Sequence, residues 1–143
     1  MDKRRILLIG DAHFLNSGYS TYMLNVLKGL YNTKKYELAE LGCYGQVGDS
    51  KLDLDVCKWK FYANAVNKDH PLNDIYHSSH PQNEHGRWRL ERILLDFKPD
   101  IYLGINDIWG CDFNINKKWW NKINCIIHWT ADSLPLQENA VNK

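Results

Sequence analysis

The sequence predicts an α/β fold, in which an open parallel sheet of about five strands is covered by helices on both faces. The first supporting observation is that short continuous apolar runs, which are typical of strands buried on both faces, alternate with amphipathic segments along the chain. The second is the composition, with 44% hydrophobic and 24% charged residues, which is that of a folded domain. The third is the length of 143 residues, which accommodates one domain of ordinary size.

The first part of the chain is expected to supply two strands and the helix between them. Residues 4–10 (R-R-I-L-L-I-G) form the first apolar run and predict a buried strand. Residues 11–18 end in Asn, Ser and Gly, which mark a helix start, and residues 19–30 carry apolar side chains at three- and four-residue intervals. This spacing predicts a helix. Residues 36–44 (Y-E-L-A-E-L-G-C-Y) alternate in part, and we expect the second strand there.

A third strand and a long irregular segment are expected next. Residues 58–66 are rich in aromatic and β-branched side chains, which favour a strand. Residues 67–86 contain two prolines and four histidines, together with several Asn and Ser residues. This composition predicts an irregular loop, with one short helix at residues 72–76.

The last part of the chain completes the predicted sheet. Residues 87–97 (R-W-R-L-E-R-I-L-L-D-F) place apolar side chains near one side and indicate a second crossover helix. Residues 100–105 and 123–129 are the fourth and fifth strands, separated by a loop over 106–116 and a short helix at 117–122. Right-handed crossovers then give a Rossmann-like sheet in the strand order 3-2-1-4-5.

The charges and the cysteines exclude several classes of protein. The 18 basic and 17 acidic side chains leave a net charge of +1, which gives no overall attraction for nucleic acid or an anionic membrane. The apolar run at residues 6–9 is far shorter than the roughly 20 residues of a membrane span. We therefore expect a cytoplasmic protein that has no integral membrane segment and binds no nucleic acid. The four cysteines form no C-x-x-C pair and are expected to be reduced.

In a sheet of this order, ligands bind beyond the carboxyl ends of the strands, at the point where the strand order reverses. Ser17 and Gly18 follow the first strand and open the first helix, where backbone N–H groups and the helix dipole favour a phosphate. A plain helix cap and turn explains the same two residues, and both interpretations stay open. The spacing is not G-x-G-x-x-G and no acid ends the second strand, so dinucleotide binding is disfavoured.

Polar and aromatic residues also follow the fourth and fifth strands. Asn106, Asp107 and Trp109 come after one strand, and His128 and Asp132 come at the end of the other. Asp107, Asp132 and His128 are candidate catalytic residues because such side chains transfer protons, while Asn106 and Trp109 are candidate contacts to a sugar. The alternatives also stay open, because a loop Asp is often a cap and a strand-end His is often a packed residue.

Four histidines raise the question of a metal site. His70, His77, His80 and His85 lie within 16 residues of one another. A metal-dependent hydrolase built on this loop is therefore one hypothesis. No cysteine joins these histidines and their spacing fits no structural zinc pattern, so we expect a solvated loop and no metal.

Several short motifs together identify a family resemblance. They are R-I-L-L-I-G at residues 5–10, S-G at 17–18, L-K-G-L at 27–30, F-K-P-D-I-Y at 97–102, N-D-I-W at 106–109 and I-I-H-W-T-A-D-S-L-P at 126–135. In these motifs, and in their order and spacing, nearly the whole chain resembles the amino-terminal domain of group 1 glycosyltransferases, which are retaining enzymes of the GT-B fold.

The resemblance implies that residues 1–143 are the acceptor-side half of an enzyme that transfers a sugar from a nucleotide-sugar donor to an acceptor, with no other cofactor. It implies that Ser17 and Gly18 approach the donor diphosphate and that Asp107, Trp109 and Asp132 surround the acceptor or the reacting sugar. The family's nucleotide-sugar domain would follow residue 143, and we expect it in cis in a longer chain. The alternative is a stand-alone flavodoxin-like module that binds or regulates a partner without catalysis.

Overall fold

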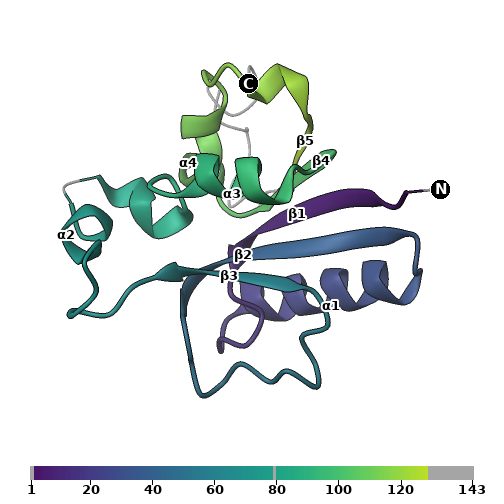
Figure 1. Ribbon diagram of the computed structural model, residues 1–143, viewed down its shortest axis with the longest axis horizontal. Helices are drawn as coiled ribbons and strands as arrows, with labels where there is room; N and C mark the ends of the chain where they lie inside the picture. The colour runs from purple at the N-terminus through teal and green to yellow at the C-terminus, as the bar shows by residue number, and fades with distance from the viewer. Residues whose placement is uncertain (1, 79, 129–143) are drawn as a thin grey trace, which may run out of the picture.

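Five strands form one parallel sheet in the computed structural model, which describes residues 2–78 and 80–128. The spatial order is β3-β2-β1-β4-β5, and each neighbouring pair is parallel. This arrangement confirms the predicted α/β, Rossmann-like sheet (Figure 1). The strands are β1 (Arg4–Asp11), β2 (Tyr36–Gln46), β3 (Lys60–Ala65), β4 (Ile101–Ile105) and β5 (Asn124–His128).

Helices cover both faces of the sheet, as predicted. Helix α1 (Gly18–Asn32) packs on one face and α3 (Leu90–Phe97) on the other (Figure 1). The shorter helices are α2 (Asn73–Tyr76), α4 (Ile108–Cys111) and three 3₁₀ helices, Pro81–His85, Asp112–Asn114 and Trp120–Lys122. Among the described residues, no helix is both long enough and apolar enough to cross a membrane.

Strand β1 lies at the centre of the sheet and contributes to both cores. Ile6 and Leu8 pack with Met23 and Leu27 of α1, whereas Leu7 and Ile9 face α3. The alternation follows from the two-residue period of a strand. It explains why the run is apolar without interruption, since a central strand has no side that faces water.

The ends of α1 and α3 have local causes in the sequence. The Ser17 hydroxyl accepts a hydrogen bond from the Ser20 N–H and caps α1. Helix α3 begins three residues later than predicted, because Gly86 takes a left-handed φ of 93° and a turn follows it. It ends at Phe97, and the next residue, Lys98, is a left-handed C-cap immediately before Pro99.

Two predicted loops contain more regular structure than the sequence indicated. Residues 67–86 include α2, close to the short helix expected at 72–76, and also the 3₁₀ helix Pro81–His85. Residues 106–116, expected to be a loop, include α4 and a second 3₁₀ turn. Single turns such as these carry no hydrophobic periodicity, so the pattern of apolar residues cannot predict them.

The four cysteines are free. Cys43, Cys57 and Cys111 are buried and Cys125 is half-buried. Burial raises the pKa of the Cys57 and Cys125 thiols to about 11, so both are protonated at neutral pH.

Candidate functional site

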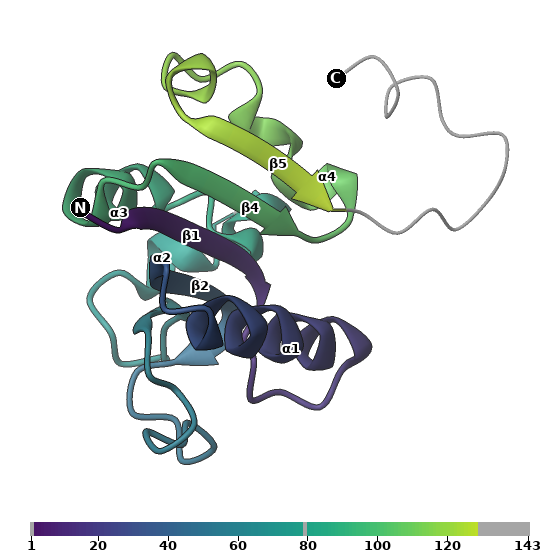
Figure 2. The ribbon, with the colours of Figure 1, turned by 90° about the vertical axis from the view of Figure 1, so that its right-hand side faces the viewer.

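The carboxyl ends of β1, β4 and β5 lie level with one another. In the sheet register, Gly10 of β1 is opposite Ile105 of β4, and Ile105 is opposite His128 of β5. Figure 2 shows the three arrowheads pointing to the same side of the molecule, with α4 beyond the tips of β4 and β5. The segments after these strands therefore meet at the reversal point of the sheet, which is where the strand order predicts a ligand.

A cavity of about 410 Å³ opens at this point, between the start of α1 and the end of β5. It is lined by Gly18, Tyr19, Tyr22, Ile105 and His128. The rings of Tyr22 and His128 are stacked, with centroids 4.7 Å apart and an interplanar angle of 22°. Two of the predicted site residues, Gly18 and His128, thus line one cavity.

Ser17 and Gly18 have different environments at the start of α1. The Ser17 hydroxyl caps the helix and donates a hydrogen bond to Asp11 Oδ2 at 2.7 Å. Gly18 is exposed, and a Cβ atom added to it would have no atom within 4 Å. The serine is thus engaged within its own loop, while Gly18 leaves the helix N-terminus open to an approaching ligand.

Asp107 connects the loop after β4 to helix α1. It occupies the N-cap position of α4, but its side chain makes no capping hydrogen bond. Its Oδ1 instead accepts a hydrogen bond of 2.6 Å from the Tyr19 hydroxyl. The carboxylate therefore faces the first turn of α1 and lies beside Tyr19, which lines the cavity.

Asn106 is buried and fixes the orientation of His85. Asn106 Oδ1 accepts a hydrogen bond from the Asp107 backbone N–H at 3.0 Å, so its Nδ2 is the group that faces His85. Nδ2 lies 2.8 Å from His85 Nδ1, which must accept this bond. In the neutral ring, the proton is then on Nε2, which lies 3.5 Å from the Tyr44 hydroxyl. Burial lowers the pKa of His85, which keeps the ring neutral near pH 7.

Two half-exposed aromatic rings flank His85. Trp109 is 49% exposed and Tyr44 is 42% exposed. Both meet the imidazole edge-on, with centroid distances of 4.7 Å and 5.9 Å respectively. Tyr44 holds a left-handed φ of 62°, which is strained for an aromatic residue. We call Tyr44, His85 and Trp109 the aromatic cluster.

His85 and Tyr44 are site residues that the sequence pattern does not predict. His85 stands in a segment expected to be an irregular loop, and Tyr44 is the last residue of the expected strand 36–44. The 3₁₀ helix Pro81–His85 carries His85 to the end of β2, and its Gln82 side chain donates to the Trp109 carbonyl and to Asp112. A left-handed tyrosine is the structural signal that marks the cluster.

Two other histidines of this segment, His70 and His80, stabilise local turns. His70 Nδ1 accepts a hydrogen bond from the Leu72 N–H, and His80 Nδ1 accepts one from the Gln82 N–H. Asp132, the remaining candidate catalytic residue, lies outside the described residues.

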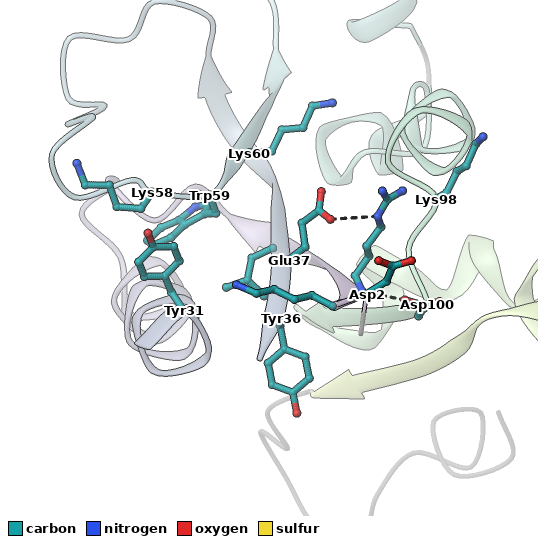
Figure 3. Close-up of a pocket in the computed structure, with 12 residues that line it drawn as sticks. Asp2, Tyr31, Tyr36, Glu37, Lys58, Trp59, Lys60, Lys98 and Asp100 are labelled. Atoms are coloured by element: carbon teal, nitrogen blue, oxygen red, sulfur yellow. Dashed lines mark hydrogen bonds and ion pairs between the residues drawn. The ribbon is translucent and has the colours of Figure 1, made fainter. Parts of the chain in front are cut away.

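A larger cavity of about 800 Å³ lies at the opposite, amino end of the strands (Figure 3). Its lining combines basic and acidic side chains, including Lys98 and Asp100. Arg5 and Glu37 form an ion pair there, with 3.2 Å between Arg5 Nε and Glu37 Oε2, and their side chains are 42% and 52% exposed. Solvent-exposed pairs of this kind are common and weak, so the size of this cavity does not identify a site.

Comparison of the chain with protein-family models finds no match, and comparison with curated proteins finds none either.

Proposed function

We propose that this chain is the acceptor-side domain of a retaining glycosyltransferase that uses a nucleotide-sugar donor. The observation that carries the proposal is the convergence of Gly18, Tyr19, Asp107 and His128 at the reversal point of a parallel sheet. Sugar transfer requires an anion site for the diphosphate, polar groups for the reacting hydroxyl and apolar surface for the sugar rings. Groups of all three kinds lie at this edge.

The start of α1 supports the donor part of the proposal. A helix of 15 residues directs its dipole and its first N–H groups towards the cavity, and Gly18 leaves them uncovered. The Asp11 carboxylate lies beside Ser17, whose hydroxyl donates a hydrogen bond to it. A diphosphate would therefore approach from the Gly18 side, away from this negative charge.

The aromatic cluster supports the acceptor part. Sugar rings present C–H groups on their faces, and exposed tryptophan and tyrosine rings bind such faces. His85 lies between Trp109 and Tyr44 and directs an N–H group towards the Tyr44 hydroxyl, where a sugar hydroxyl could accept it. Because Asn106 fixes the imidazole, this donor is already oriented before a ligand binds.

Asp107 and His128 are the described groups that could exchange a proton with the acceptor hydroxyl. Asp107 has one oxygen bonded to Tyr19, which holds the carboxylate in place. His128 is exposed at the cavity and is stacked on Tyr22. We assign both groups to the reacting centre, and a second domain would complete that centre.

Two matched glycine variants test the donor part by calorimetry. Gly18 and Gly29 are both exposed on α1 with open space beside them, so glutamate fits at either position. With UDP-glucose and GDP-mannose as probes, Gly18→Glu should weaken the binding of the preferred donor at least tenfold, or about 1.4 kcal/mol. The new charge would lie at the diphosphate.

Gly29→Glu is the control, because it adds the same charge to the same helix about three turns from the cavity. It should bind the donor as the wild-type chain does. Equal losses in the two variants, or no binding of either nucleotide sugar, would contradict the donor assignment. The second outcome would favour a binding module without catalysis.

A further inference from the structure

A carboxylate is buried inside the core that α1 covers. Glu40 lies in the middle of β2 and is fully buried. Its Oε1 accepts the backbone N–H of His13 at 2.9 Å, and its Oε2 lies 2.7 Å from both His13 Nδ1 and Trp59 Nε1. Three donors therefore surround one carboxylate, which offsets the cost of removing its charge from water.

Cys57 approaches the same point from a third segment. His13 follows β1, Glu40 belongs to β2 and Cys57 precedes β3, yet one ligand atom from each lies within 4.8 Å of the others. All three residues are buried. The Sγ atom donates only a long contact of 3.5 Å to the Trp59 carbonyl. The convergence of nitrogen, oxygen and sulfur atoms is not explained by the hydrogen bonds of Glu40 alone.

We propose that His13, Glu40 and Cys57 bind one divalent metal ion of the zinc class. Imidazole, carboxylate and thiolate are all ligands of zinc, with bond lengths of about 2.0–2.3 Å, and a tetrahedral ion holds such atoms about 3.5 Å apart. The three ligand atoms already lie within 4.8 Å of one another, so small side-chain movements would bring them to these positions.

The surroundings of the proposed ion match those of metal sites. Ligating carboxylates are usually hydrogen-bonded from outside the site, and Glu40 already accepts bonds from the Trp59 indole and the His13 backbone. A cavity of about 300 Å³ opens on His13 and would admit the ion and a water as fourth ligand. It is lined by His13, Phe14, Leu24, Lys51, Asp53 and Val56.

Binding exchanges protons for the metal. The ion displaces the proton between His13 Nδ1 and Glu40 Oε2, and the thiol proton of Cys57 passes to solvent. The affinity should therefore increase with pH. A bound ion would tie the loop after β1 to β2 and to the start of β3, and so would restrain the segment that leads to Gly18.

Cobalt titration of the full chain, reduced with a phosphine and freed of metal with a chelator, tests the proposal. We expect one equivalent of Co²⁺ to give a thiolate-to-cobalt charge-transfer band and the visible bands of a tetrahedral ion. Zinc should remove both. Cys57→Ser should lose the charge-transfer band and bind Zn²⁺ at least tenfold more weakly, whereas Cys125→Ser, which changes another free thiol, should leave both unchanged.

Alkylation of the wild-type chain provides a test that needs no variant. At a pH high enough to ionise buried thiols, Zn²⁺ should protect Cys57 from iodoacetamide and leave the rate at Cys125 unchanged. A wild-type chain that shows no charge-transfer band with stoichiometric Co²⁺, or a Cys57 alkylated equally fast with and without Zn²⁺, would overturn the proposal.

Discussion

The two ends of the parallel sheet carry polar residues in opposite environments. At the amino end, Arg5 and Glu37 form an exposed ion pair beside the larger cavity. Beyond the carboxyl end, Asn106 and His85 are buried and hydrogen-bonded to each other, and Asp107 is fixed by a tyrosine hydroxyl. Buried polar groups are costly unless their bonds are complete, so their concentration at one end requires a reason that exposed pairs do not.

This difference teaches that burial and orientation identify a candidate site better than cavity volume does. The 800 Å³ cavity is the larger of the two, yet the ion pair in its lining is exposed and screened by solvent. The 410 Å³ cavity has fewer charges, but its neighbours are held in single orientations.

The largest effect is expected for Glu40→Ala. This change leaves the His13 backbone N–H, the His13 ring and the Trp59 indole without their buried acceptor. The free energy of unfolding should fall by about 3 kcal/mol or more, as measured by urea denaturation. A loss below about 1 kcal/mol would mean that water reaches these groups, and the contrast with exposed carboxylates would then disappear.

Asn106→Ala should have an intermediate effect. It removes the donor to His85 Nδ1 and the acceptor for the Asp107 N–H, and should cost about 1–3 kcal/mol in the same measurement. The His85 ring should also lose its fixed tautomer, which nitrogen-15 shifts of the imidazole report. Asn121→Ala, an exposed change, should stay within about 0.5 kcal/mol of wild type, and a similar loss in both variants would contradict the assignment.

The pH dependence of stability should report the neutral His85. Its pKa in the folded chain lies below the ordinary 6.5 because of burial. Below 6.5 the unfolded chain binds a proton that the folded chain does not, so the free energy of unfolding falls as the pH falls through this window. One such group contributes a slope of at most about 1.4 kcal/mol per pH unit.

His85→Gln should remove this part of the slope, because glutamine does not titrate. Subtracting the slope of the variant from that of the wild-type chain isolates the contribution of His85 from those of the other histidines. Equal slopes in the two proteins would show that the folded imidazole takes up its proton over the same pH range as in the unfolded chain. That result would contradict the buried, neutral ring of the proposed acceptor site.

The smallest effect is expected at the amino end of the sheet. Glu37→Ala breaks the exposed pair with Arg5, which should change the free energy of unfolding by less than about 1 kcal/mol and less still at high salt. Glu37 and Glu40 are the same residue type on the same strand, so the pair of variants compares environment alone. A loss as large as that of Glu40→Ala would contradict the comparison.

The fold could be predicted from the sequence because its strands are simple. Residues 6–9 are apolar throughout, and a strand covered on both faces is the arrangement that buries them all. Once five strands are joined by crossover connections, the right-handedness of these connections restricts the possible strand orders. The start of α3 was placed too early, because the left-handed Gly86 acts through backbone geometry that hydrophobic periodicity does not record.

The candidate site could be predicted only in part. Gly18, Asp107 and His128 follow strand ends, and the rule for parallel sheets brings such positions together. Tyr44 and His85 lie 41 residues apart and meet through a long-range contact, which no local pattern encodes. Glu40 lies in a segment that alternates only in part, and its burial depends on hydrogen bonds to His13 and Trp59, which are distant in the sequence.

Chemical-shift mapping of the labelled chain with a nucleotide sugar tests the central claim most directly, because it observes both ends of the sheet at once. The proposed function predicts shifts at Gly18, Asp107 and His128, with Lys98 and Asp100 at the amino-end cavity unchanged. Shifts confined to Lys98, Asp100 and their neighbours would contradict the claim and transfer the candidate site to the opposite end of the sheet.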